Sequence, residues 1–295
     1  MATTCEYIDL VHVPDAPDIP GLHFRGFRGA SDYPHIVAVF NESMRADGIE
    51  IVRTVEDVAN EYTSNSHFNP YEDMLFAEIG DQVIGYSRVL TLEEERGDLI
   101  YHSNGVLLPE WRRRGIGRAM LHYNEERLRE FAADHPTDQP RLLESMAAEC
   151  EVEATALLRS EGYKPVVYFA DMLRPDLENI PDAPLPEGLE VRPVETGHTR
   201  AIWEAQKEAF RDHWGYVPPD ENDYQQWLND PITFQPELWQ IAWDGDQVAG
   251  QVKPFINHEE NQSYGRLRGY AELISVGRSW RRRGLARALL VRSLH

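Results

Sequence analysis

An eleven-residue stretch occurs twice in this 295-residue chain, and the duplication limits the possible folds more than any other feature. The first copy, WRRRGIGRAML, spans residues 111–121, and the second, WRRRGLARALL, spans residues 280–290. Each copy follows an apolar run typical of a strand and opens a segment with the apolar spacing of an amphipathic helix. The sequence therefore predicts two domains of the same kind, each with a strand–loop–helix unit.

The similarity extends well beyond the arginine-rich stretches. The sequence PDAP at 14–17 recurs at 181–184, and GDQV at 80–83 recurs at 245–248. The spacing between copies differs slightly from one motif to the next, which indicates small loop insertions within a duplicated domain. We predict four segments, which are an N-terminal arm at 1–21, domain one at 22–174, a proline-rich linker at 175–188 and domain two at 189–295.

Strands and helices are mixed within each half. In domain one the expected strands are 22–28, 74–79, 83–92, 98–108, 141–148 and 163–173, with helices at 32–45, 55–62 and 152–160. In domain two the expected helices are 202–210 and 221–228, and the expected strands are 238–243, 248–256 and 267–276. This pattern predicts an α+β domain with a mixed α/β sheet.

Domain two is expected to be C-terminally incomplete in this chain. Domain one is expected to continue from Gly115 as far as Arg174, whereas the chain runs from Gly284 only to His295. The missing elements would leave a strand edge and apolar surface to be covered. Residues 7–11 of the arm alternate plausibly for a covering strand, and a second chain is the other candidate.

The arginine-rich loop has the features of an anion site. Gly115 lets the backbone approach a ligand closely, and the first N–H groups of a helix lack internal acceptors and favour an anion. Three arginines beside these donors predict a pyrophosphate cradle. The residues do not match a P-loop or a G-x-G-x-x-G site. Solvated arginines or a nucleic-acid patch are the alternatives, but the second copy and a net charge of -21 disfavour both.

The pattern Arg-x-x-Gly-x-Gly/Ala between strand and helix resembles the acetyl-CoA signature of the GNAT superfamily. Arg112, Gly115 and Gly117 match it in one half, and Arg281, Gly284 and Ala286 in the other. Two such domains resemble tandem-domain GNAT N-acetyltransferases of the mycothiol synthase type. The resemblance implies the GNAT fold, acetyl-CoA as cofactor and a small-molecule amine as acetyl acceptor. It implies these cofactor-binding residues: Val106, Leu107, Arg112, Arg113, Arg114, Gly115, Ile116, Gly117, Arg118, Ser275, Val276, Arg281, Arg282, Arg283, Gly284, Leu285, Ala286 and Arg287.

Acetylation of an amine needs a base, because an ammonium group cannot attack a thioester. Glu272 lies among apolar residues of the strand before the second arginine-rich stretch, where burial would raise the pKa of a carboxylate. Tyr270 shares its face by strand alternation. Glu272 and Tyr270 are therefore the catalytic candidates, and a solvent-facing or ion-paired strand residue is the alternative. The spacing between the two arginine-rich stretches places Ser103 at the position of Glu272 in domain one, beside His102.

The departing thiolate needs an acid, for which GNAT domains commonly use a tyrosine on the helix after the next strand. In domain one that position is Leu158, and Tyr163 replaces a phenylalanine of the same pattern. We therefore expect domain two to be the reactive half and domain one a cofactor-binding scaffold. The alternative is a non-catalytic acetyl-CoA-binding or interaction protein. Residues 210–220, with Tyr224 and Trp227, are expected either to recognise the acceptor or to pack the domain.

Composition sets the remaining limits. The two cysteines, Cys5 and Cys150, predict no disulfide framework and a reducing, cytoplasmic compartment. The N-terminus lacks the basic and apolar regions of a signal peptide, and no apolar run has the length of a membrane span. We expect no metal site, no nucleic-acid partner and no membrane partner, whereas an oligomer remains open.

Overall fold

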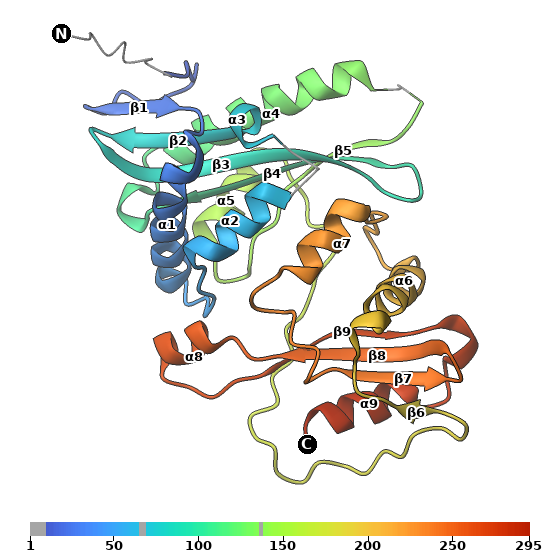
Figure 1. Ribbon diagram of the computed structural model, residues 1–295. Coiled ribbons are helices and arrows are strands. Elements are labelled where there is room, and N and C mark those ends of the chain that lie inside the picture. The colour runs from blue at the N-terminus through green and yellow to red at the C-terminus, as the bar shows by residue number, and fades with distance from the viewer. Residues whose placement is uncertain (1–9, 65–68, 136–137) are drawn as a thin grey trace, which may run out of the picture. The chain divides into compact units, whose positions relative to one another are not determined.

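The computed structural model describes residues 10–64, 69–135 and 138–295, and it divides the chain into two compact units (Figure 1). The units are Met1–Val166 and Val167–His295. Each contains one sheet with helices packed against it, so the predicted mixture of α and β structure is confirmed. The division falls before the predicted linker at 175–188, and our domain boundaries stay a prediction.

The first unit is built on a five-stranded sheet in sequence order. Neighbouring strands are antiparallel except for the last two, which are parallel. The strands are β1 (Leu22–Arg25), β2 (Met74–Ile79), β3 (Gln82–Glu93), β4 (Leu99–Leu107) and β5 (Arg141–Glu144). The helices are α1 (Tyr33–Ala46), α2 (Val55–Ser64), α3 (Pro70–Asp73), α4 (Ile116–Asp134) and α5 (Val152–Ser160), with 3-10 turns η1 (Gly29–Asp32) and η2 (Pro109–Trp111).

Strand alternation decides which helices cover which face of this sheet. Ser87 on β3 points to α4, where its hydroxyl donates to Asn124 at 3.1 Å. The next residue, Arg88, points to the opposite face and pairs with Glu61 on α2. The sheet therefore lies between α4 on one side and α2 on the other.

The second unit repeats this plan with a four-stranded antiparallel sheet (Figure 1). Its strands are β6 (Glu190–Val191), β7 (Gln240–Asp244), β8 (Gln247–Phe255) and β9 (Tyr270–Val276). Its helices are α6 (Thr199–Phe210), α7 (Glu221–Leu228), α8 (His258–Tyr264) and α9 (Leu285–Ser293), with 3-10 turns η3 (Thr196–His198) and η4 (Arg278–Trp280). The helix α9 and the strand β9 before it correspond to α4 and β4 of the first unit.

One difference separates the two sheets. The β3–β4 pairing runs without a shift from Gly85↔Leu107 to Glu93↔Leu99. The β8–β9 pairing shifts between Gln251↔Ser275 and Lys253↔Glu272, so that one residue of β8 faces two of β9. One of those two, Leu273, has φ 49°, in the left-handed region that most residues avoid. Strand β9 therefore carries a β-bulge that β4 lacks.

Two predictions about elements are wrong. Residues 163–173 form no strand, and their apolar side chains are largely exposed (Val166, Tyr168, Phe169, Met172 and Leu173). The structure adds helix α8 in a stretch between two expected strands, and Asn257 caps it by accepting from the Glu260 N–H at 3.1 Å. The described end of the arm strand expected to cover domain two, Leu10–Val11, pairs with β1 of its own unit, where the Val11 N–H donates to the Phe24 carbonyl at 2.8 Å. Residues 7–9 of the arm lie outside the described residues.

Two further observations concern the described part of the chain. None of its helices is at once long and apolar enough to cross a membrane. Within the same residues, no three His, Cys, Asp or Glu side chains are grouped to hold a metal ion.

The core of the second unit contains a buried lysine. Lys253 on β8 is 2% exposed and lies in an aromatic cluster, 4.3 Å from the ring centre of Trp227 and 5.0 Å from that of Trp239. Its ammonium donates to the Gln206 side chain and reaches no carboxylate among the described residues. Burial lowers the pKa of Lys253 to about 7, while the two indole faces offset part of the cost of burying the charge.

We expect Lys253→Met to stabilise the protein at pH 7 and below, by about 2–4 kcal/mol. In the unfolded protein a lysine has a pKa of roughly 10.4, whereas buried Lys253 has a pKa of about 7. Between these two pH values the unfolded state therefore binds more protons than the folded state. Wild-type stability should therefore rise with pH across that window, and the advantage of the variant should shrink. Urea unfolding at pH 6, 8 and 10 measures this, with Lys207→Met on α6 as the surface control. A gap that stays constant with pH would contradict the lowered pKa.

Candidate functional site

The two arginine-rich loops have nearly the same unusual backbone. Arg113 and Gly115 have φ 63° and 88°, and the matching Arg282 and Gly284 have φ 61° and 84°. Left-handed conformation at a non-glycine residue is strained and persists where the surrounding structure enforces it. Alternation of such residues turns successive N–H groups toward one concave surface, which is a common way to bind an anion.

The start of each following helix adds further donors. The first helical hydrogen bonds are Ala119 N–H to the Gly115 carbonyl at 3.1 Å and Ala288 N–H to the Gly284 carbonyl at 3.0 Å. The amides earlier in each first turn have no intrahelical acceptor and lie at the positive end of the helix dipole. We call residues 113–118 and 282–287 the cradles of domain one and domain two. Ile116 and Leu285 are buried at 0% and 1% exposure, so these two residues offer only backbone to a ligand.

The side chains of Arg112 and Arg281 are bound to other parts of their own domains, and their binding to the cofactor stays a prediction. Arg112 donates from Nε to the Leu107 carbonyl at 3.1 Å and forms a two-point ion pair with Asp47 at 2.6 and 2.8 Å. Arg281 makes the equivalent contacts, because its Nε donates to the Val276 carbonyl at 3.0 Å and its Nη1 donates to Asp212 at 2.7 Å. We call this interaction the brace, because it ties the end of the strand before the cradle, β4 or β9, to the end of the first long helix, α1 or α6.

The sequence reasoning missed Asp47 and Asp212. The sequence contains a signal for them, because the separation between the two aspartates equals the separation between the two GDQV copies at 80–83 and 245–248. Both follow the first long helix of their domain, α1 and α6. A carboxylate at matched positions in a duplicated chain indicates a shared structural partner, which here is the first arginine of each stretch.

The other predicted cofactor residues differ in what they contact. Arg114 lies over the Trp111 ring at 4.8 Å, and Arg118 pairs with Glu161 at 2.7 Å. Arg283 donates to the Glu187 carbonyl at 3.2 Å. The predicted residues that are exposed to solvent are Arg113, Arg114, Gly115, Arg118, Arg282, Arg283, Gly284 and Arg287. Those that are buried or half-buried are Val106, Leu107, Gly117, Ser275, Val276 and Ala286.

Glu272 lies directly beside the β9 bulge, at the exposed edge of the sheet. It pairs with Lys253, so the two side chains lie on the same face of the sheet, where Lys253 is buried beneath α6 and α7 and Glu272 is exposed to solvent. The pKa of Glu272 is raised, first by partial burial and then by the negative charges of Asp171 and Glu260. A carboxylate with a raised pKa among other acids is suited to attract an ammonium group and accept its proton.

Tyr270 lies on the same face as Glu272 but is held by α8. Its ring stacks on Phe255 at 5.0 Å, and its hydroxyl donates to Glu260 Oε2 at 2.5 Å. Arg266 donates to the same hydroxyl at 3.1 Å. Burial and the bond to Glu260 raise the pKa of Tyr270, so this residue stays protonated.

The predicted counterpart of Glu272 in domain one was wrong. Strand pairing aligns Lys253↔Glu272 with Arg88↔Asn104, because the bulge adds one residue to β9. Asn104 is therefore the counterpart. Ser103 lies on the opposite face, buried at 3% exposure, where its hydroxyl accepts from Asn124 at 3.0 Å.

The proposed acceptor segment divides into two parts. Tyr224 and Trp227 are 6% and 8% exposed and belong to the aromatic core, so these residues pack the domain. His213 and Trp214 are exposed, and Phe169 contacts both rings at centroid distances of 6.4 and 6.1 Å. In domain one, the hydroxyl of Tyr163 donates to Glu125 at 3.0 Å, so it serves the helix contact.

Comparison with known proteins identifies the class. A model described as "Acetyltransferase (GNAT) domain" matches residues 70–165, and one described as "Acetyltransferase (GNAT) family" matches residues 199–294. Together the two matches span almost two thirds of the chain. The chain belongs to the GNAT acetyltransferases and contains two GNAT domains in tandem, which confirms the resemblance seen in its sequence.

Named relatives narrow the comparison. A mycothiol acetyltransferase of Geodermatophilus obscurus is 27% identical over 225 residues, which cover 73% of this chain and 65% of that protein. One of Catenulispora acidiphila is 29% identical over 173 residues, covering 58% of this chain and 51% of that protein. The match thus spans less than two thirds of either relative.

Solved structures share the fold. A GCN5-related N-acetyltransferase from Sphaerobacter thermophilus has a TM-score of 0.63 at 22% identity, covering 94% of this chain and 83% of that one. A tandem GNAT protein from the clavulanic acid biosynthesis pathway has a TM-score of 0.56 at 14% identity, covering 92% and 84%.

Because the aspartate of the brace is buried in domain one and exposed in domain two, replacing its arginine should reduce the unfolding free energy by different amounts in the two domains. Arg112→Met would leave the carboxylate of Asp47, whose side chain is 6% exposed, without its cation, so we expect a loss of about 2–3 kcal/mol in unfolding free energy. Arg281→Met should cost less, because Asp212 is 51% exposed and water replaces the lost contact. Arg114→Met is the control and should change stability by no more than about 0.5 kcal/mol. Urea unfolding of the three variants measures the order, and equal losses at Arg112 and Arg114 would contradict the brace.

Proposed function

We propose that this chain is an acetyl-CoA-dependent N-acetyltransferase in which domain two transfers acetyl to a small amine and domain one binds cofactor without turnover. The observation that carries the division is the β9 bulge with Glu272 beside it, a combination that β4 does not have. A protein that uses acetyl-CoA in this way is expected in the cytoplasm. The mycothiol acetyltransferase relatives support a small-molecule acceptor.

The two cradles support the choice of cofactor. Each provides left-handed loop residues, unpaired first-turn amides and exposed arginines at one helix start. This donor set suits a diphosphate, which carries several negative oxygens close together. Acetyl-CoA contains such a diphosphate and supplies the acetyl group as a thioester. The fit holds in both domains because the loops have the same backbone.

The bulge in β9 gives domain two a further donor. The extra residue at Leu273–Ile274 is outside the regular ladder, so a main-chain amide there need not pair with β8. An amide directed at a thioester oxygen stabilises the charge that develops during attack, at a typical value of about 2.7–4 kcal/mol. In domain one, the corresponding stretch of β4 pairs regularly with β3.

Glu272 is the proposed base. Its raised pKa and the nearby charges of Asp171 and Glu260 favour an arriving ammonium and the transfer of its proton to the Glu272 carboxylate. Tyr270, protonated and fixed by Glu260, is placed to orient a polar acceptor group by hydrogen bonding. Asn104 at the matching position of domain one has no basic atom.

Glu272→Gln keeps the shape of the side chain and removes the base, so we expect kcat to fall by about 10²–10⁴-fold. The CoA affinity should change little, because Glu272 is not part of a cradle. The pH profile of the wild type should rise as Glu272 loses its proton above the ordinary carboxylate range, and the variant should lose that rise. Release of CoA thiol with a panel of primary amines measures both. Asn104→Ala is the matched control, and full turnover by Glu272→Gln would overturn the assignment.

The cradles can be separated by glycine substitutions. Gly115→Val and Gly284→Val each place a side chain at a left-handed position, so each should abolish CoA binding in its own domain. Titration calorimetry should show two CoA sites in the wild type and one in each variant. Turnover should persist in Gly115→Val and vanish in Gly284→Val. CoA binding with no acetyl transfer to any amine, even by the wild type, would favour the non-catalytic alternative.

A further inference from the structure

The repeated PDAP segments lie beside the cradle helices of their own domains. In domain one, Pro14 and Asp15 line a groove of about 510 Å³ together with His122 of α4. In domain two, residues 181–184 line one of about 390 Å³ together with Val291 of α9. The offset between the cradles makes Val291 the counterpart of His122. The duplication therefore supplies two versions of one contact, and the histidine that faces the acidic residue of the PDAP segment in domain one is replaced by a valine in domain two.

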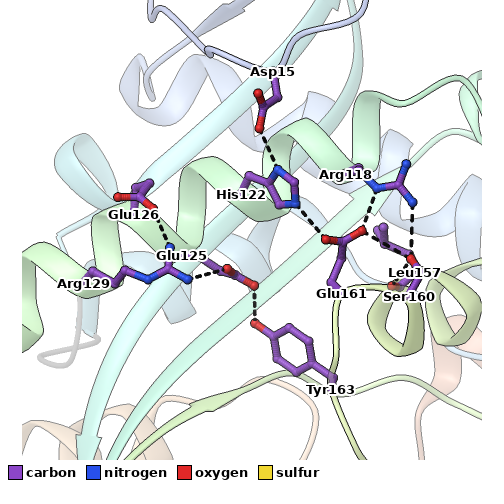
Figure 2. A network of polar contacts seen from close by, with 10 residues as sticks. All are labelled: Asp15, Arg118, His122, Glu125, Glu126, Arg129, Leu157, Ser160, Glu161 and Tyr163. Atoms are coloured by element: carbon purple, nitrogen blue, oxygen red, sulfur yellow. Dashed lines mark hydrogen bonds and ion pairs between the residues drawn. The ribbon is translucent and has the colours of Figure 1, made fainter.

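In domain one, a network of ion pairs and hydrogen bonds connects the PDAP segment of the arm to α4 and to the end of α5 (Figure 2). His122 Nδ1 lies 2.7 Å from Asp15 of the arm, and Nε2 lies 2.9 Å from Glu161 at the end of α5. Glu161 also accepts from Arg118 Nε at 2.7 Å. An imidazole with a carboxylate at each nitrogen satisfies both bonds as a donor when it is protonated.

The fastened segment flanks the cradle of domain one. A Cβ on Gly115 would lie 3.5 Å from Cβ of Pro17, and one on Gly117 would lie 3.6 Å from Leu157 of α5. Gly284 in domain two has no such neighbour within 4 Å among the described residues. Asp182, the counterpart of Asp15, faces the aliphatic Val291 across its groove. The arm thus lies against Gly115 in one cradle, whereas no described residue of the matching linker segment comes as close to Gly284 in the other.

We propose that Asp15, His122, Glu161 and Arg118 form a proton-controlled clasp, which holds the N-terminal arm against the cradle of domain one and releases it as pH rises. The arm is well placed to move as a segment. It is anchored at Val11 by pairing with β1 and at Val13, which is 4% exposed, and its next side-chain attachment is Asp15. Release of Asp15 frees Pro17 from the first turn of α4.

The other charges around His122 do not replace its two carboxylates. His12 of the arm lines the same groove, as do Arg127 and Glu130 of α4, which pair with each other at 2.9 Å. Glu125 and Glu126 of α4 both pair with Arg129, at 2.9 and 2.5 Å. Tyr163 also donates to Glu125. Asp15 and Glu161 are therefore the acids that act on His122.

The direction of the pH effect follows from these partners. Hydrogen bonds to Glu161 and then Asp15 raise the pKa of His122 above its ordinary value of 6.5. A raised folded pKa means that the stabilisation is complete below 6.5 and is lost as pH increases through the higher folded value. The clasp is closed at mildly acidic pH and opens toward alkaline pH.

Hydrogen–deuterium exchange of the full chain tests the clasp without a ligand. Protection factors of the arm amides between Val11 and Ile19, corrected for intrinsic exchange rates, should fall about tenfold or more between pH 6 and pH 9 in the wild type. His122→Gln and Asp15→Asn should show the low value at both pH values. Asp182→Asn is the matched control and should leave wild-type behaviour in both segments. Wild-type protection that is independent of pH, or an equal effect of Asp182→Asn, would overturn the proposal.

A second readout connects the clasp to the cofactor and rests on the proposed function. With the domain two cradle removed by Gly284→Val, Asp15→Asn should raise the CoA affinity at pH 6 severalfold and have little effect at pH 9. An unchanged affinity at pH 6 would show that the arm does not cover the cradle. Absence of any CoA binding would instead count against the proposed function, whereas the exchange experiment would still decide whether the clasp exists.

Discussion

The brace between the first arginine of each stretch and the aspartate after the first helix determines the geometry of the site. Arg112 holds the Leu107 carbonyl and Asp47 at once, and Arg281 holds the Val276 carbonyl and Asp212. The strand end, the helix end and the loop between strand and cradle helix are thereby fixed together. A loop with a left-handed arginine and a left-handed glycine is strained, and such an anchor is what keeps it in one conformation.

Cationic side chains at one strand position show how the two halves differ on the sheet face opposite the cradle helix. Arg88 in domain one is paired with Glu61, which Arg53 also contacts at 2.9 Å. At the matching position of domain two, Lys253 has aromatic rings and one amide oxygen as partners. The same strand position thus carries a compensated charge in one half and an almost uncompensated one in the other. The buried Lys253 therefore lowers the stability of domain two, which is also the half that contains Glu272.

Much of the fold could be predicted from the sequence, because the turn residues that bound the strands and helices occur in both copies of the duplicated domain. The bounds of β2, α5 and α7 match the expected ones, since each has clear periodicity and flanking turn residues. The bulge could not be predicted, because a one-residue shift in register looks like any other drift between repeats. Sequence spacing alone therefore predicts Ser103 as the counterpart of Glu272, whereas strand pairing gives Asn104. The role of Arg112 was also hidden, since its partner Asp47 lies far away along the chain, at the end of α1.

The bulge makes β4 and β9 differ in register, although both strands lead into a cradle. The segment between the cradle and Glu272 is one residue longer in β9 than the matching segment of β4. The bulge absorbs this extra residue, so the residues before and after it point to the same sheet faces as their counterparts in β4. If β9 replaced β4 residue for residue and paired regularly, the carboxylate would occupy the position of Ser103 and point into the core against α4. Exchange of the two strands would therefore place the Glu272 carboxylate in the buried position that Ser103 occupies. A one-residue difference in register is thus enough to make two similar strands structurally non-equivalent.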